Sequence, residues 1–162
     1  MRLPYRIAWG CGTVGLRPLK EEDYADLVKL WKNAGLSWDW GDDQGSYVEA
    51  VRRFGQHYWG YQWNDRLIGC VLGAFDGRRG WIYHLAVADP FRRRGIGRLL
   101  MQAAERSLRQ HGCQKINLLI EPHNLEVAAF YQALGYQAVA NQFMEKPLLT
   151  LTPPDGASGE IV

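Results

Sequence analysis

At 162 residues, with 47% hydrophobic and 22% charged residues, the chain fits one globular domain and is too short for two ordinary ones. Its formal net charge of +2 is too small to indicate nucleic-acid binding, and no apolar run approaches the roughly 20 residues that span a membrane. The three scattered cysteines, Cys11, Cys70 and Cys113, exclude a disulfide framework and a zinc site of paired cysteines. We therefore expect a reduced, cytoplasmic protein without a membrane or nucleic-acid partner.

The spacing of apolar residues and turn signals divides the chain into elements. In chain order they are an irregular extension at 1–11, a strand at Thr13–Leu19, a helix at Glu21–Ala34, a loop at Leu36–Gly45, a helix from Ser46 to about Phe54, strands at Tyr58–Trp63, Leu67–Phe75 and Trp81–Ala88, a helix at Gly95–Gln110, a strand at Lys115–Ile120, a helix at about Leu125–Leu134, a final strand pair after Tyr136, and a loose tail at 151–162.

Turns and connections in this order indicate the fold class. The pairs Asn64-Asp65 and Asp76-Gly77 are turn signals, so the strands around them are expected to form antiparallel hairpins. The later alternation of strand and helix implies parallel pairing. Ser46, with Glu49 three residues on, predicts a capping box for the second helix. We expect a mixed α/β (α+β) fold, with a central sheet of about six to seven strands flanked by about four helices.

The segment from His84 to Arg98 is the most informative, because an apolar strand, a basic run, two glycines and an amphipathic helix follow one another. The exposed N–H groups of a helix's first turn form an anion site, which the helix dipole reinforces. Gly95 and Gly97 lack Cβ, so a phosphate can approach the backbone. Guanidinium groups suited to phosphate oxygens come from Arg92, Arg93, Arg94 and Arg98. This arrangement predicts a cradle for a di- or triphosphate.

Other glycine-rich phosphate motifs fit this segment less well. A dinucleotide fingerprint needs a third glycine where the chain has Leu100, and a Walker loop needs Gly-Lys-Ser/Thr, which is absent. The simpler interpretation is that the arginines are solvated and the glycines only shape a turn. The combination of strand, basic run, glycines and helix favours the phosphate site.

The pattern Arg92-x-x-Gly95-x-Gly97 after a strand resembles the Q/R-x-x-G-x-G/A signature of the GNAT superfamily of N-acetyltransferases. The likeness runs from about Val14 to Leu148. It includes Leu16-Arg17-Pro18 before an acidic helix, and Asn124 followed by Phe130-Tyr131-Gln132-Ala133-Leu134-Gly135-Tyr136. Within the superfamily, the chain is similar to the bacterial YpeA-like branch, itself near ribosomal-protein alanine acetyltransferases. The resemblance implies a GNAT fold, with 12–150 as a single acetyltransferase domain.

The resemblance also implies an acyltransferase that moves the acetyl group of acetyl-coenzyme A directly to a primary amine. The main chain of Leu85, Ala86 and Val87 would then bind the pantetheine arm and acetyl group, and N–H donors near Val87 would stabilise the oxyanion. Asn124 would hydrogen-bond the arm. The pyrophosphate would be bound by the signature loop, which comprises Arg92, Arg93, Arg94, Gly95, Ile96, Gly97 and Arg98.

Tyr131 is the candidate general acid, because a well-placed phenol can protonate the leaving thiolate. The alternative is core packing beside Phe130; because neighbouring helical positions point differently, we expect the two rings not to share a face. Asn124 has a second interpretation as an N-cap. Some relatives carry a glutamate base twelve residues before the tyrosine, where this chain has Leu119. The base is therefore left open between His84, Glu121 and water.

The loop at Leu36–Gly45 contains Trp38, Asp39, Trp40, Asp42 and Asp43, a combination that suits a cationic amine, although its tryptophans could equally fold into the core. The acceptor stays open among a protein N-terminus, a lysine, a polyamine and a small metabolite. Two other functions remain: an acyl-coenzyme A sensor with little catalysis and, ranked last, a nucleic-acid binder that uses the loop arginines with Arg78 and Arg79. The oligomeric state is also open, with a homodimer as one option.

Overall fold

The computed structural model describes residues 13–37 and 39–148. The predicted irregular extension at 1–11 and the loose tail at 151–162 lie outside the described residues. The strands are β1 Val14–Pro18, β2 Trp59–Trp63, β3 Arg66–Phe75, β4 Gly80–Val87 and β5 Ile116–Leu118. The helices are α1 Tyr24–Ala34, α2 Gln44–Phe54, α3 Ile96–Gln110 and α4 Ala128–Gln132, with short 3-10 turns η1 Glu21–Asp23, η2 Gly55–His57, η3 Asp89–Phe91 and η4 Pro122–Val127.

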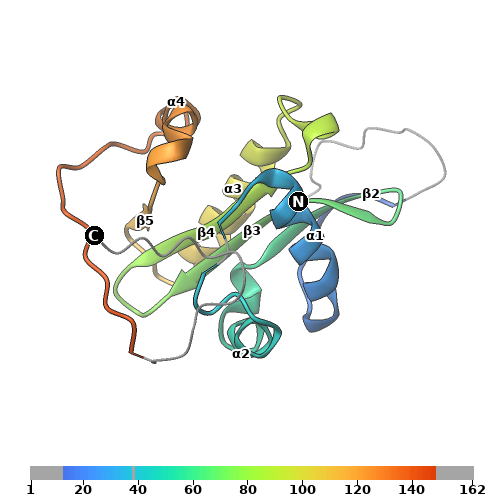
Figure 1. Ribbon diagram of the computed structural model, residues 1–162, viewed down its shortest axis with the longest axis horizontal. Coiled ribbons are helices and arrows are strands. Elements are labelled where there is room, and N and C mark those ends of the chain that lie inside the picture. The colour runs from blue at the N-terminus through green and yellow to red at the C-terminus, as the bar shows by residue number, and fades with distance from the viewer. Residues whose placement is uncertain (1–12, 38, 149–162) are drawn as a thin grey trace.

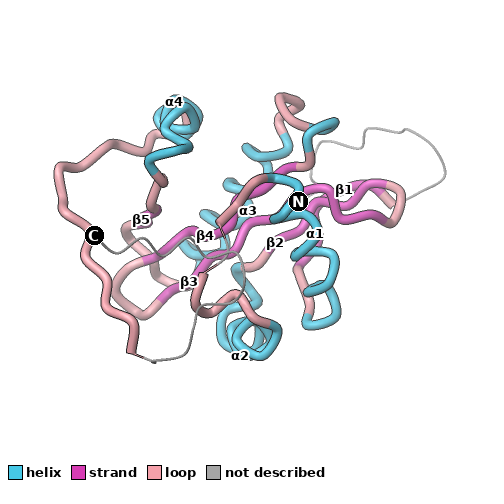
Figure 2. Tube along the Cα trace, viewed as in Figure 1, coloured by secondary structure: helices cyan, strands magenta, loops and turns pink. Residues whose placement is uncertain are grey.

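The strands form one mixed sheet in the order β1-β2-β3-β4-β5 (Figures 1 and 2). The first three pairings are antiparallel and β4–β5 is parallel, as the turn signals and the later alternation predicted. At the β2–β3 turn, Asn64 and Asp65 both adopt positive φ, 48° and 59°. Two such residues match the twist of a tight hairpin. The mixed α/β architecture is therefore confirmed.

The sheet has five strands in the described part of the chain, fewer than the six to seven expected. The predicted strand pair after Tyr136 is wrong for residues 137–148, which form no strand (Figure 2). Two features account for this. β5 is only three residues long and offers a short edge for pairing. A tight turn, in which the Asn141 N–H donates to the Val139 carbonyl at 2.9 Å, also interrupts the segment.

Helices cover both faces of the sheet and create two cores. The cluster on one face joins α1 and α2 to β3 and contains Leu27, Trp31, Tyr47, Cys70 and Leu72 among its buried members. The cluster on the other face joins α3 to β3 and β4 and contains Ile68, Val71, Ile82, Leu100 and Leu108. In Figure 1, α3 lies behind the sheet and α1 in front of it. The sheet is thus clamped between two apolar layers, which holds the ends of its strands rigidly.

Two helices begin at residues other than those predicted, because of local side-chain contacts and backbone dihedrals. The N-cap of α2 is Asp43 and not Ser46: the Asp43 carboxylate accepts from the Ser46 N–H at 3.0 Å and from the Ser46 hydroxyl, so the helix begins two residues earlier. The helix predicted at Leu125–Leu134 is the 3-10 turn η4 followed by the five-residue α4. Pro122 opens η4, and non-helical dihedrals at Asn124 interrupt it.

A buried histidine ties η2 to α3. His57 is 1% exposed; its Nδ1 lies 2.8 Å from the Ser107 hydroxyl, which itself donates to the Gln56 carbonyl at 2.6 Å. Nδ1 must therefore carry the proton, and Nε2 accepts from the Gln56 amide at 3.3 Å. The His111 ring stands edge-on at 4.8 Å. Burial first, and then the neighbouring His111, lowers the pKa of His57 to about 4.

This network predicts a loss of stability in mild acid. Histidines in the unfolded chain bind a proton near pH 6.5, whereas folded His57 binds it near 4. The contribution of His57 to the free energy of unfolding should therefore be fully present above pH 6.5. It should decrease as the pH falls from 6.5 to 4, by at most about 3 kcal/mol. Urea unfolding at pH 7 and 4.5 measures the change. In His57→Gln the acid loss should shrink, and an equal loss in both proteins would contradict the assignment.

Candidate active site

The sheet opens between β4 and β5. The parallel register runs from Gly80–Ile116 to Ile82–Leu118 and ends there. Beyond it, β4 continues to pair with β3 as far as Val87–Gly69, but no described strand pairs with its other edge. The predicted residues Leu85, Ala86 and Val87 lie on this open stretch. Their backbone is the part of the sheet that a long, extended ligand can reach.

A β-bulge shapes the same stretch of β4. Cys70 pairs with Ala86 and Leu72 with Tyr83, so one β3 residue opposes two residues of β4. The extra residue is His84, whose φ is 49°. The Cys70 thiol donates to the His84 carbonyl at 3.3 Å, which gives that carbonyl a partner beside the bulge. Bulges re-aim a side chain and are common beside active sites.

The loop that follows β4 presents unpaired N–H groups. Arg93 and Gly95 both adopt left-handed backbone, with φ 59° and 83°, and α3 begins at once. The first helical hydrogen bond runs from the Leu99 N–H to the Gly95 carbonyl, so the N–H groups of residues 96–98 have no helical acceptor. No side chain caps the helix. A helix of fifteen residues that ends in three open donors is suited to bind an anion.

Gly97, in the first turn of α3, lies close to α4 and to the end of β4. A Cβ at this position would lie 3.4 Å from Cζ of Phe130 on α4, and 3.9 Å from Cγ2 of Val87 at the end of β4. One methyl group would just fit there, and a longer side chain would fill the gap between the two helices. Binding of a phosphate group at this helix start stays a prediction.

The four loop arginines differ in what they contact. Arg92 braces the loop: its Nε donates to the Val87 carbonyl at 3.0 Å, one terminal nitrogen to the Ala34 carbonyl at 3.3 Å, and the other lies 2.9 Å from Asp89 Oδ1. The guanidinium of Arg94 lies 5.9 Å from the centre of the Phe91 ring. Exposed side chains that remain available to phosphate come from Arg93, Arg94 and Arg98. The predicted ring of four equivalent arginines is therefore one brace and three exposed cations.

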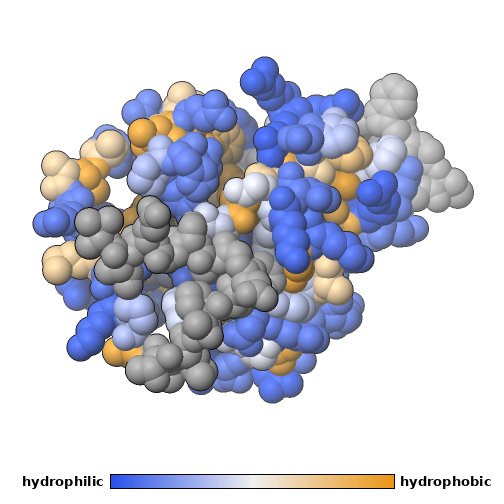
Figure 3. Space-filling view, in the orientation of Figure 1, coloured by the Kyte–Doolittle hydropathy of each residue, from blue (hydrophilic) through white to orange (hydrophobic). Residues whose placement is uncertain are grey.

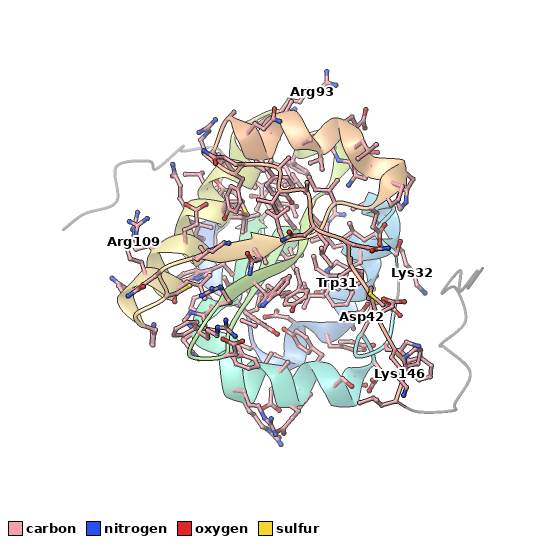
Figure 4. All side chains as sticks on the ribbon, turned by 90° about the vertical axis from the view of Figure 1, so that its left-hand side faces the viewer. Trp31, Lys32, Asp42, Arg93, Arg109 and Lys146 are labelled. Carbon is pink, nitrogen blue, oxygen red and sulfur yellow. The ribbon has the colours of Figure 1, made fainter. Side chains whose placement is uncertain are left out.

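This difference gives a testable pair of variants. Arg92→Ala removes three contacts that join α1, β4 and η3, so the free energy of unfolding should fall by about 1–2 kcal/mol. Arg93→Ala removes an exposed side chain, which Figure 4 shows pointing away from the body of the protein, and should leave stability unchanged. Chemical denaturation of both variants measures this. Equal stability of the two would contradict the bracing role.

Tyr131 lies on α4 and lines a cavity of ≈ 1150 Å³ between α4, β5 and the residues that follow Tyr136. Its ring meets those of Phe130 and Tyr136 edge-on, at 5.2 and 5.8 Å. Phe130 and Tyr131 both pack against the core cluster of α3, but from different directions, because Phe130 lies beside Gly97 and Tyr131 lines the cavity. Consecutive helical positions differ by about 100°, in agreement with the expectation that the rings do not share a face. Burial raises the pKa of Tyr131 to about 12.

Asn124 is not a helix N-cap, which removes one of its two interpretations. It lies inside η4, where its N–H donates to the Glu121 carbonyl at 2.9 Å, and the N-cap of α4 is Val127. Its side-chain amide has no hydrogen-bond partner among the described residues. A free amide is what a ligand contact requires, and that role remains a prediction.

The loop after α1 brings acidic groups to β4. Nε2 of His84 lies 3.2 Å from Asp42 Oδ1, and the His84 ring packs against Trp31 with centroids 4.4 Å apart. The Tyr24 hydroxyl donates to the Asp42 carbonyl at 2.9 Å, which fixes the loop to α1. The sequence offered no signal for the contact between His84 and Asp42, because these two residues lie 42 positions apart in the chain.

The same loop also reaches the end of β5. The Ser37 hydroxyl donates to Glu121 Oε2 at 2.8 Å, and His123 Nε2 lies 3.1 Å from the same oxygen. Trp40 is 38% exposed, so the alternative that the loop tryptophans fold into the core fails for this residue; Trp38 lies outside the described residues. The loop therefore spans the two strands that diverge and carries carboxylates and an exposed aromatic ring to that place.

The described residues offer little sign of metal or membrane chemistry. Among residues 13–37 and 39–148 no group of histidine, cysteine, aspartate and glutamate could hold a metal ion. No helix in this part of the chain is long and apolar enough to cross a membrane. Figure 3 shows a largely hydrophilic face, with apolar side chains gathered near α4 and the segment after it. The exposed members there include Leu125, Val139, Phe143 and Met144.

Comparison with known proteins identifies relatives of the chain. Residues 12–136 match the Acetyltransferase (GNAT) family. Acetyltransferase ECA0875 of Pectobacterium atrosepticum is 30% identical over 124 residues, which are 76% of this chain and 88% of that protein. Two solved structures share the fold. Ard1 from Thermoplasma volcanium has a TM-score of 0.70 at 20% identity and covers 78% of this chain and 84% of its own. The PaiA N-acetyltransferase from Thermoplasma acidophilum, in complex with coenzyme A, has a TM-score of 0.71 at 16% identity and covers 80% and 93%.

Proposed function

Because the chain belongs to the GNAT acetyltransferase family, and is an N-acetyltransferase that uses acetyl-coenzyme A as donor, we propose that its acceptor is a cationic primary amine bound at the acidic loop of residues 39–43. The observation that supports this acceptor is the position of the loop. Its Asp42 carboxylate lies against His84 on β4, beside the open backbone at Leu85, Ala86 and Val87. A carboxylate beside the transferred group favours a positively charged partner.

The donor's diphosphate would be held by the backbone N–H groups of residues 96–98, with the exposed cations of Arg93, Arg94 and Arg98 around it. Bound there, acetyl-coenzyme A supplies an acetyl group activated as a thioester. The open edge of β4 would orient the arm, because its N–H and C=O groups lack a strand partner on that side. The free amide of Asn124 would add one further hydrogen bond.

Two features define the acceptor end. The carboxylates of Asp39 and Asp43 lie in the same loop as Asp42, and exposed aromatic rings come from Trp40 and Tyr83, which are 38% and 45% exposed. Aromatic faces and carboxylates together bind ammonium groups. A protein N-terminus, a lysine side chain, a polyamine and a small diamine all present such a group, so charge is the property that the site selects.

Tyr131 would act on the leaving thiol. Burial raises the pKa of its phenol to about 12, which keeps the phenol protonated across the neutral and alkaline range. It is therefore available as a donor to a developing thiolate, whose conjugate acid has a pKa near 8.5. Because the phenol is the weaker acid, its role is a strong hydrogen bond to sulfur more than a complete proton transfer.

The experiment that tests this function is a release assay for free thiol from acetyl-coenzyme A with a panel of amines. The panel holds short peptides with a free N-terminus, Nα-acetyl-lysine, spermidine and ethylenediamine. Their fully N-acetylated forms, which have no free amine, are the controls. Acetylation of at least one cationic amine, confirmed by product mass, supports the proposal. Tight binding of acetyl-coenzyme A by calorimetry without turnover on any amine would support the alternative, an acyl-coenzyme A sensor.

A further inference from the structure

His84 stands at the bulge of β4, between an aromatic ring and a carboxylate. Trp31 packs on one side of it, and Asp42 Oδ1 lies 3.2 Å from Nε2. The side chains of His84 and Asp42 are 17% and 12% exposed, so the pair is shielded from bulk water without being sealed off. Screening by water and salt is weak at such a position, so the Asp42 carboxylate interacts more strongly with the ring than it would at the surface.

The backbone at His84 is strained in a way that orients this ring. Its φ of 49° is uncommon for a residue with a side chain, and such outliers cluster at functional sites. The bulge supplies the reason, because it sets His84 out of the alternation that Tyr83 and Leu85 would otherwise impose. The fold therefore maintains an unfavourable conformation that holds an imidazole against Asp42.

We propose that His84 is the general base that deprotonates the acceptor's ammonium group and that Asp42 is its positioning residue; this rests on the proposed function. A carboxylate against Nε2 favours a proton on that nitrogen, which leaves the lone pair on Nδ1. Nδ1 has no hydrogen-bond partner among the described residues. In the step, an N–H bond of the ammonium breaks, the proton bonds to Nδ1, and the electron pair stays on the amine nitrogen as the nucleophile. Asp42 then stabilises the imidazolium.

Asp42 is the charged neighbour that contacts the His84 ring, and the nearby thiol and phenol groups stay neutral. From β3 the thiol of Cys70 faces the His84 carbonyl, and burial raises the pKa of Cys70 to about 12. Burial, followed by the nearby Tyr83 and Asp42, raises the pKa of Tyr58 to about 12, and burial also raises the pKa of Tyr83. These groups stay neutral over the range in which an imidazole titrates, so they neither compete for the proton nor repel it.

Glu121 is the rival base, and its surroundings suit that role less well. Its side chain is 49% exposed, and a single oxygen, Oε2, already meets the Ser37 hydroxyl at 2.8 Å and His123 Nε2 at 3.1 Å. This oxygen is therefore already occupied by two partners from the protein. These contacts account for Glu121 as a tie between the acidic loop and the end of β5.

Kinetics of His84→Gln test the base with whichever panel amine the wild-type protein acetylates fastest. At neutral pH, kcat/KM should fall about 100-fold with no change in the Kd of coenzyme A. The deficit should shrink as pH rises, because the amine then loses its proton in solution. His123→Gln removes another histidine that contacts a carboxylate, and should keep wild-type activity. The proposal is overturned if turnover is unchanged in His84→Gln. It is also overturned if Glu121→Gln loses activity about 100-fold and His84→Gln does not.

Asp42 is tested by a readout that a purely structural role would not move. Nitrogen NMR of the free protein should show the proton of neutral His84 on Nε2, and this preference should weaken in Asp42→Asn. The same variant should lower kcat at neutral pH, and Asp42→Glu should restore part of it. Asp39→Asn removes the same charge from the same loop and should raise KM while leaving kcat and the position of the His84 proton unchanged.

The outcomes separate this proposal from the proposed function. A proton on Nδ1 of His84 in the free protein overturns the assignment without any assay of turnover. Activity that survives in His84→Gln overturns the base and leaves the amine acetyltransferase intact. If the wild-type protein acetylates none of the amines of the panel, both the proposed function and the base are overturned.

Discussion

Replacing Gly97 with leucine is expected to weaken the binding of acetyl-coenzyme A roughly 1000-fold. A Cβ at this position already lies 3.4 Å from the Phe130 ring and 3.9 Å from Val87, so the rest of a leucine side chain must push apart α4 and the first turn of α3, which carries the open N–H groups. A diphosphate would then lose its contacts with the three open N–H groups, and charge-assisted hydrogen bonds contribute about 1.5–3 kcal/mol each. Calorimetry with coenzyme A measures the loss.

Gly97→Ala is the graded companion of this variant. The added methyl makes only ordinary contacts, and alanine favours a helix over glycine by about 0.5–1 kcal/mol. Gly97→Ala should therefore unfold at a slightly higher temperature and bind coenzyme A about as well as the wild type, since the last position of the signature admits alanine. A loss of binding in Gly97→Ala as large as in Gly97→Leu would contradict the steric explanation.

A second pair of glycines controls for backbone strain. Gly95 and Gly112 lie just before and just after α3, with φ of 83° and 88° and open space around both. Alanine should destabilise the protein by a similar amount, about 1 kcal/mol, at either position. Binding of coenzyme A should fall only in Gly95→Ala. If Gly112→Ala weakens binding as much, the cradle at residues 95–98 is not the diphosphate site.

Tyr131→Phe is expected to lower kcat by roughly 1000-fold, within the range of general acid–base groups, and to leave the Kd of coenzyme A unchanged. The substitution removes one hydroxyl from a ring that keeps its packing against Phe130 and Tyr136. Since burial raises the pKa of Tyr131 to about 12, wild-type activity should show no alkaline loss from this group below about pH 10. Steady-state rates and a pH profile measure both effects.

Tyr136→Phe is the matched control, because Tyr136 is a neighbouring buried tyrosine with a structural partner. Its hydroxyl donates to Glu105 Oε1 at 3.0 Å, so its loss should reduce stability by about 1 kcal/mol and leave kcat in place. The Tyr131 assignment fails if the two variants show the same kcat, or if Tyr131→Phe changes stability alone.

Elements whose signals are local were predicted well. The strands β2, β3 and β4 and the helix α3 lie within one or two residues of their expected bounds, because turn pairs such as Asn64-Asp65 and the apolar spacing of α3 act over a few residues. Predictions near the C-terminal end were poorer. Residues 137–148 carry apolar side chains in a strand-like pattern, but strand formation needs an edge to pair with, and β5 has only three residues.

The candidate site divides in the same way. The cradle of residues 92–98 could be predicted because a strand end, two glycines and a helix start are contiguous. The separate task of Arg92 could not, since its acceptors include the Ala34 carbonyl, 58 residues away. The burial that raises the pKa of Tyr131 could not be predicted either, because this burial depends on how α4 packs beside β5.

By itself, the sequence determined where the glycine loop and the start of α3 lie and that antiparallel hairpins precede a parallel strand, because these properties reside in backbone conformations of neighbouring residues. The tertiary structure alone decided which carboxylate meets His84. Asp42 reaches it only because α1 covers β4 and the loop after α1 turns back toward the bulge, and contacts over such separations follow from packing and not from local spacing.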